Sequence, residues 1–85
     1  MKKNLKIKGI VVPVSWDDDG NILRISIHTT DENEYLIEQS KMGIDLLSHI
    51  QSKIVAEGPV RTRLDGKSII NVKGYRLISD YNSDL

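Results

Sequence analysis

Residues 44–57, IDLLSHIQSKIVAE, decide the predicted fold, because their large apolar side chains recur at helical spacing. The apolar stripe consists of Ile44, Leu47, Ile50 and Ile54, with Leu46 beside it. Ser40 or Gly43 caps the start of this helix. Gly58-Pro59 ends it, because glycine adopts the left-handed cap conformation and proline cannot continue a helix. The pattern predicts one helix with one buried face.

The segments on either side of this helix carry strand patterns. The 85-residue chain contains 12 Ile and 6 Val but no Phe, and β-branched side chains suit a pleated, half-buried surface. We expect three strands before the helix, at residues 5–16, 22–30 and 34–39, and two after it, at 60–64 and 68–79. Residues 17–21, residues 31–33 and Asp65-Gly66 form the tight turns between strands. A single, mainly β domain follows.

The regular strands alternate between two faces. The side chains expected to face inward are Leu23, Ile25, Ile27, Tyr35, Ile37, Val60, Thr62 and Leu64. Those expected to face outward include Arg24, Ser26, His28, Leu36, Arg61 and Arg63.

The first and last strands change their inward face part-way. Leu5 and Ile7 precede Gly9, whereas the apolar alternation beyond it is Ile10, Val12, Val14 and Trp16. In the same way Ile70 and Val72 precede Gly74, and Tyr75 and Leu77 follow it. Such a shift needs an extra residue, and a glycine is the usual place for a bulge or bend. We therefore expect Gly9 and Gly74 to be corners of a closed sheet.

This chain resembles the OB-fold, a five-stranded Greek-key barrel whose helix lies between the third and fourth strands. The resemblance covers residues 5–79 and rests on the element order, Gly9, Gly74, the Gly58-Pro59 stop and the Asp65-Gly66 turn. It implies a closed or partly open barrel in which strand one pairs with strand four. Residues 1–4 are then a flexible N-terminus and residues 80–85 a flexible tail. The competing β-grasp has two strands before its helix, and an SH3-like barrel lacks so long a helix.

The resemblance implies a ligand face on strands two and three, bordered by the loops that join strands one to two and four to five. The candidates for this face are Trp16, Arg24, Ser26, His28, Leu36 and Lys67. Binders of single strands place stacking aromatics and cations on this face. Here strands two and three offer only Arg24 and His28 as cations and no outward aromatic, and the acidic residues 17–19 lie in a bordering loop. The usual face therefore lacks the pattern of a nucleic-acid binder.

Charge is distributed unevenly along the chain. The 12 basic and 12 acidic residues balance, so the whole molecule exerts no general attraction on nucleic acid or acidic membranes. Residues 17–38 hold seven acidic residues and one basic residue. The basic-patch candidates on strands one, four and five are Lys6, Lys8, Arg61, Arg63, Lys73 and Arg76. The alternative is that these cations solvate the strands and discourage edge pairing.

No catalytic or metal-binding motif is present. The chain has no Cys, and its two histidines, His28 and His49, lie on different elements without a carboxylate constellation. We therefore expect no enzyme activity, metal or cofactor, no membrane span and a cytoplasmic location.

Two functional hypotheses follow from these patterns. The first is a non-catalytic interaction module that binds a protein partner or itself through an apolar patch formed by exposed Ile22, Leu36, Ile69 or Ile78. The alternative is weak binding of single-stranded nucleic acid by the basic strands.

Overall fold

The computed structural model describes residues 3–78, within which six strands form one sheet. The elements are β1 (Lys3–Trp16), β2 (Ile22–His28), β3 (Glu34–Ile37), α1 (Lys41–Asp45), the 3-10 turn η1 (Leu46–His49), β4 (Lys53–Thr62), β5 (Ser68–Ile70) and β6 (Gly74–Leu77). Residues 1–2 and 80–85, which belong to the two termini predicted to be flexible, lie outside the described residues. The predicted mainly β class with one short helix is confirmed.

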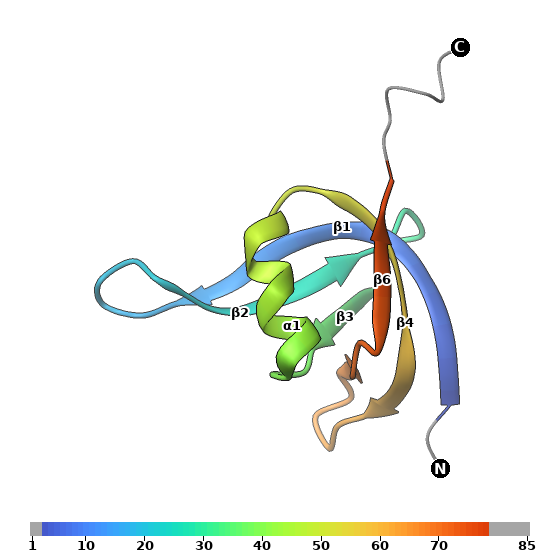
Figure 1. Cartoon of the computed structure of the whole chain (residues 1–85). Coiled ribbons are helices and arrows are strands. Elements are labelled where there is room, and N and C mark those ends of the chain that lie inside the picture. Colours follow the sequence, from blue (N-terminus) through green and yellow to red (C-terminus); the bar gives the residue numbers. More distant parts are fainter. Residues whose placement is uncertain (1–2, 79–85) are drawn as a thin grey trace.

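The sheet closes on itself in part (Figure 1). Its order is β1-β2-β3-β5-β4-β6, and β1 pairs with β4 as well, so five strands form a ring. The first strand pairs with the fourth as predicted, but the paired residues of β4 are 53–60, most of which had been assigned to the helix and its stop. Only β3 and β5 run parallel among the pairs of this sheet. The ring encloses a core made of Ile7, Val11, Ile25, Ile27, Ile37, Leu46, Ile54, Ala56, Ile70 and Val72.

The predicted long helix is wrong over most of its length. Helical structure ends at His49, and residues 53–57 belong to β4. Gln51 adopts a φ of 72°, its N–H donates to the Val11 carbonyl at 2.7 Å, and the Val11 N–H donates to the Ser52 carbonyl at 3.1 Å. Hydrogen bonding to β1 thus ends the helix. The four-residue spacing of Ile50 and Ile54 fits both a helix and a strand, so periodicity alone did not separate the two.

The helical stripe was also assigned to the wrong face. Leu46 is fully buried, whereas Ile44 is 61% exposed and Leu47 39% exposed. The predicted cap is confirmed at Ser40, whose Oγ accepts a hydrogen bond from the Gly43 N–H at 3.1 Å. The helical segment therefore covers the core with one large residue and leaves two others outside.

Gly58-Pro59 is not a helix stop, because it lies within β4. A Cβ on Gly58 would come within 2.0 Å of the Asn71 carbonyl oxygen, so no side chain fits there. The Pro59 carbonyl accepts the Asn71 N–H at 3.0 Å. The pair therefore allows β4 and the connection between β5 and β6 to approach each other closely.

Gly9 lies at the predicted corner, but the inward face does not change there. Ile7, Gly9 and Val11 are all buried in continuous alternation, while Ile10 is 38% exposed and Trp16 53% exposed. The register shifts of β1 occur later, between Pro13 and Trp16. Ile10 pairs with Lys53 of β4 and with His28 of β2, so β1 passes from one partner to the other beside Gly9 (Figure 1).

The second predicted phase change is confirmed and lies just before Gly74. Val60 pairs with Ile70 and Glu57 with Gly74, so β4 advances by three residues while the opposite strand advances by four. The extra residue in 71–73 divides the predicted fifth strand into β5 and β6. Ile70 and Val72 are buried and Tyr75 packs on the core as expected, but Leu77 is 49% exposed.

Three hairpin turns share one backbone geometry. In each, the first residue donates its N–H to the carbonyl of the fifth, and the fourth donates back to the carbonyl of the first. The fourth residue has a positive φ, namely Gly20 at 87°, Glu32 at 68° and Gly66 at 88°. This is the three-residue hairpin loop that ends in a left-handed residue. The turns predicted at residues 17–21, 31–33 and Asp65-Gly66 are confirmed, although the second begins at Thr29.

Leu64 does not face inward. It occupies the second position of the turn after β4 and is fully exposed. β4 ends two residues earlier, at Thr62, so alternation was extended beyond the end of the strand.

Candidate functional site

The predicted ligand face on β2 and β3 is closed at its centre. Ser26, Leu36 and Ile69 are direct neighbours across β2, β3 and β5, and they are exposed by 0%, 8% and 8%. The apolar patch expected from exposed Leu36 and Ile69 is therefore wrong. Ile22 is partly buried, and so is Ile78.

The charges on this face bind one another. The Ser26 hydroxyl donates to Glu34 Oε2 at 2.9 Å, and His28 Nε2 lies 3.5 Å from the same oxygen. On the other side Arg61 forms an ion pair with Glu38. Arg61 is the β4 neighbour of Ile69, so this pair crosses β5 above the Leu36–Ile69 contact. These polar groups hold each other and shield the apolar row.

The remaining face candidates lie at its edges. Trp16 is half exposed at the end of β1. Lys67 follows the β4–β5 turn, where its N–H donates to Asp65 Oδ1 at 3.1 Å. Arg24 is exposed, and no hydrogen bond or ion pair joins it to another residue within 3–78. Of the six predicted residues, Arg24 and Lys67 have charged side chains that no ion pair or hydrogen bond engages within residues 3–78.

The predicted basic patch divides into two parts. Lys6 pairs with Glu57, while Lys8 and Arg76 both pair with Val55, so these three cations share the outer face of β1, β4 and β6. Lys6, Glu57 and Arg76 also line one shallow hollow of about 240 Å³.

The other three candidates lie elsewhere. Arg61 binds Glu38, and Arg63 Nη2 lies 3.4 Å from Asp65 Oδ2. Lys73 belongs to the bulge between β5 and β6, where its N–H donates to the Glu57 carbonyl at 2.8 Å.

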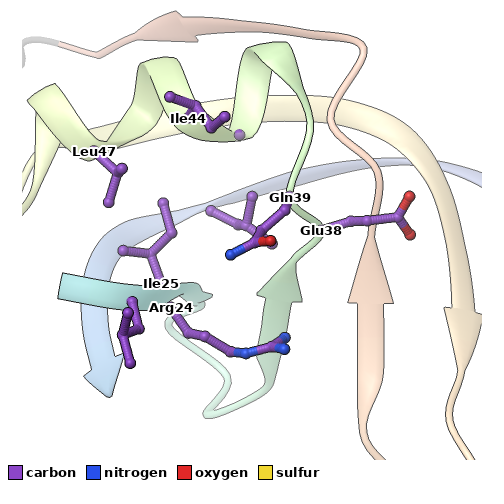
Figure 2. Close-up of a pocket in the computed structure, with 9 residues that line it drawn as sticks. Arg24, Ile25, Glu38, Gln39, Ile44 and Leu47 are labelled. Atoms are coloured by element: carbon purple, nitrogen blue, oxygen red, sulfur yellow. The ribbon is translucent and has the colours of Figure 1, made fainter. Parts of the chain in front are cut away.

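A groove that the sequence did not indicate lies between the helical segment and β2 (Figure 2). Its apolar lining comes from three parts of the chain, namely Gly43, Ile44 and Leu47 of the helical segment, Leu23 and Ile25 of β2, and Ile37 of β3. The volume of this open groove is about 40 Å³, which suits part of one side chain. Arg24, Glu38 and Gln39 also border it, but the charged ends of Arg24 and Glu38 point away from α1 (Figure 2). Leu23, expected to face inward, is instead 50% exposed.

Contacts on both sides of the helical segment fix its position beside the groove. At Gly43 a Cβ would come within 2.4 Å of the Glu38 carbonyl oxygen, so the helix sits tightly against the end of β3. On the other side the Tyr75 hydroxyl donates to Asp45 Oδ2, and the His49 ring contacts the Tyr75 ring at 5.8 Å. The hydrogen bond to Asp45 raises the pKa of Tyr75, as do desolvation and the carboxylate charge.

No family model matches the chain, and no curated protein matches it. Within residues 3–78, no three His, Cys, Asp or Glu side chains are grouped to hold a metal ion. None of the helices in that range has the length and apolar character needed to cross a bilayer. What the groove could bind therefore follows only from the residues that line it.

Proposed function

We propose that the chain is an OB-like barrel that acts as a non-catalytic binding module, with a protein partner occupying the groove between α1 and β2. The OB-like assignment is supported by the ring of five strands, by the β1–β4 pairing and by the helical segment between β3 and β4. The partner binds beside the usual OB face rather than on it, because that face is filled by its own side chains.

The groove carries the proposal because its walls leave large apolar side chains in solvent. Leu23, Ile44 and Leu47 are 50%, 61% and 39% exposed, and covering each of them contributes about 1 kcal/mol. Arg24 borders the groove and has no partner within residues 3–78, and its guanidinium lies on the other side of β2 from α1 (Figure 2). Part of an apolar side chain matches the groove, and the neighbouring Arg24 favours a partner with acidic charge.

The test uses two probe peptides, N-acetyl-Ser-Leu-Asp-Ser-amide and N-acetyl-Ser-Leu-Lys-Ser-amide, titrated into isotopically labelled protein. We expect amide chemical-shift changes confined to residues 23–25, 37–39 and 43–47, with tighter binding of the peptide that contains Asp. Ile44→Glu removes binding, whereas the matched control Leu77→Glu, which changes a similarly exposed residue on β6, retains it. Shifts scattered over the surface, or none at millimolar peptide, contradict the proposal.

The alternative function is weak binding of single-stranded nucleic acid. It is favoured by the common outer face of Lys6, Lys8 and Arg76, and Glu57 on the same face opposes it. A labelled oligothymidylate titrated at low and moderate salt tests it, because phosphate contacts weaken as salt rises. Lys6→Gln combined with Lys8→Gln abolishes this binding, and the control Lys41→Gln on α1 leaves it intact. A flat titration at low salt rejects this function.

A further inference from the structure

An open hollow of about 540 Å³ lies on the outer face of the sheet, where β1 passes from β4 to β2. Ile10 lies at its centre, because it pairs with His28 of β2 on one side and with Lys53 of β4 on the other. Lys8 and Val12 stand two residues before and after Ile10, so they share its face of the strand. The floor of the hollow therefore consists of β1 side chains that face away from the core.

The size of this hollow fits a small organic molecule. Ligand sites in proteins have volumes of roughly 300–1,000 Å³ and combine apolar surface with a few polar groups. The groove between α1 and β2 is much smaller, at about 40 Å³, and the two linings share no residue. A ligand of the hollow is therefore independent of the partner proposed for the groove.

The lining combines an apolar floor with basic side chains. Ile10 is 38% exposed and Val12 is partly exposed, so both offer surface to a hydrocarbon or aromatic body. The ionisable residues of the lining are Lys8, His28 and Lys53, and none of its residues is acidic. This combination favours a ligand that is apolar over most of its length and carries a negative charge.

One ammonium and one hydroxyl of the lining are available to that charge. The side chains of Lys8 and Thr30 form no hydrogen bond or ion pair with another residue within 3–78. Both also line an adjoining hollow of about 300 Å³, so they belong to the same end of the site. A carboxylate accepts hydrogen bonds from both kinds of group.

Two carboxylates near the hollow limit the charge that the ligand can carry. Glu34 accepts a hydrogen bond from Ser26 and lies 3.5 Å from His28 Nε2. Asp31 lines the adjoining hollow and accepts a hydrogen bond from the Thr29 hydroxyl. Their negative charges oppose a phosphate dianion more strongly than a carboxylate with a single charge.

We propose that this hollow binds a small organic monoanion, namely a carboxylate joined to a hydrocarbon or aromatic body. The body covers Ile10 and Val12, and the carboxylate accepts hydrogen bonds from the Lys8 ammonium and the Thr30 hydroxyl. This inference goes beyond the proposed function, because it assigns a second site to a different class of ligand.

Three probes separate the apolar and the charged parts of this recognition. The carboxylate 4-phenylbutyrate, the neutral 4-phenylbutan-1-ol and acetate are each titrated into isotopically labelled protein. We expect 4-phenylbutyrate to shift the amide signals of residues 8–12, 28–30 and 51–53 and to bind at least roughly threefold more tightly than the alcohol. Acetate has no apolar body and gives no saturable shift at the same concentrations. Equal binding of acid and alcohol overturns the inference, as does an acetate response equal to that of 4-phenylbutyrate.

One variant tests the charged end of the site. Lys8→Gln changes an exposed side chain and removes its charge, so we expect the preference for the acid over the alcohol to fall below about twofold. The control Lys41→Gln, on α1 and outside the lining, keeps the preference of the unmodified chain. A preference that Lys8→Gln leaves unchanged overturns the inference.

A second variant tests the apolar floor. Ile10→Thr keeps a β-branched residue but reduces the apolar surface, so both aromatic probes bind at least roughly threefold more weakly. The control Leu77→Thr, on β6 and 49% exposed, leaves their binding unchanged. Circular dichroism melting checks that the variants are folded. Equal binding by Ile10→Thr and the unmodified chain overturns the inference.

Failure of this inference is distinct from failure of the proposed function. If 4-phenylbutyrate gives no saturable shift at millimolar concentration while the probe peptide still binds the groove, only the hollow is rejected. If 4-phenylbutyrate binds and the peptide does not, the hollow stands and the groove is rejected.

Discussion

The β1–β2 turn and the β4–β5 turn have the same backbone but different relations to solvent. Both close with the same pair of main-chain hydrogen bonds and place a glycine at a φ near 90°. In the first, Asp17 Oδ1 accepts the N–H groups of Asp19 and Asn21, each at 2.9 Å. In the second, the equivalent first residue is Arg63, and Leu64 stands beside it in full contact with water.

The comparison shows which position of this turn is fixed by the backbone and which accepts different residues. The left-handed fourth residue is a backbone requirement, because a side chain there is strained. The second residue carries no such requirement, since it is Asp18 in one turn and Leu64 in the other. The turn therefore does not require an apolar residue at that position.

The largest expected effect comes from breaking the shared backbone. Gly66→Val places a β-branched residue at a φ of 88°, and we expect it to lower the free energy of unfolding by about 2 kcal/mol. The control Leu64→Val, in the same loop but without a positive φ, leaves that free energy unchanged within about 0.5 kcal/mol. Urea denaturation measures both, and equal stability of the two variants contradicts the turn geometry.

The third turn gives the opposite test. Glu32 holds the position that Gly20 and Gly66 hold in the other two turns, at a φ of 68°. Glu32→Gly relieves this strain, and we expect a gain of roughly 0.5–1 kcal/mol in the free energy of unfolding. Thr30→Gly is the matched control and lowers stability, because it adds chain entropy where the φ is not positive. Thermal melting that ranks these two variants in the other order counts against the assignment.

The β1–β2 and β4–β5 turns are also expected to differ in how their contribution to stability depends on pH. Hydrogen bonds, above all from the Asn21 N–H, lower the pKa of Asp17 below its ordinary value of 3.8. Because the pKa of Asp17 is lower in the folded state than in the unfolded state, its ionised carboxylate stabilises the fold at pH values above the ordinary pKa. This contribution is lost as the pH falls through the folded-state pKa. Asp17→Asn therefore loses stability at neutral pH and shows a shallower loss on acidification.

The measurement for this prediction is urea denaturation at pH 7 and pH 3. Arg63→Gln, at the equivalent position of the β4–β5 turn, removes no titrating carboxylate and keeps the acid dependence of the unmodified chain. Parallel acid dependence of Asp17→Asn and the unmodified chain would show that the Asp17 hydrogen bonds contribute nothing to folding.

The smallest expected effect on stability is that of Leu64→Thr. We expect the free energy of unfolding to stay within about 0.5 kcal/mol of the unmodified chain, because the side chain makes no buried contact. A clear loss of stability, seen by thermal melting, would mean that Leu64 contributes to the fold despite its exposure.

The site was less predictable than the fold. Arg24 was identified as an outward cation, but its neighbours in the groove were assigned to a buried helical face or to the barrel interior. A usable signal was present, since Ile44, Leu46 and Leu47 are too close in sequence to share one face of a short helical segment. Which of them faces solvent depends on how far the helix extends, and that is a tertiary property.

The sequence by itself determined the features that depend on a few neighbouring residues. These are the three tight turns, the Ser40 cap, the alternation of Ile25 and Ile27, and the phase change in residues 68–77. Only the tertiary structure decided that residues 53–57 form a strand, because pairing with β1 outweighs a helical pattern whose spacing also fits β structure. It also decided that Leu36 is covered while Ile44 and Leu47 remain in solvent, since burial depends on which distant side chains lie across each face.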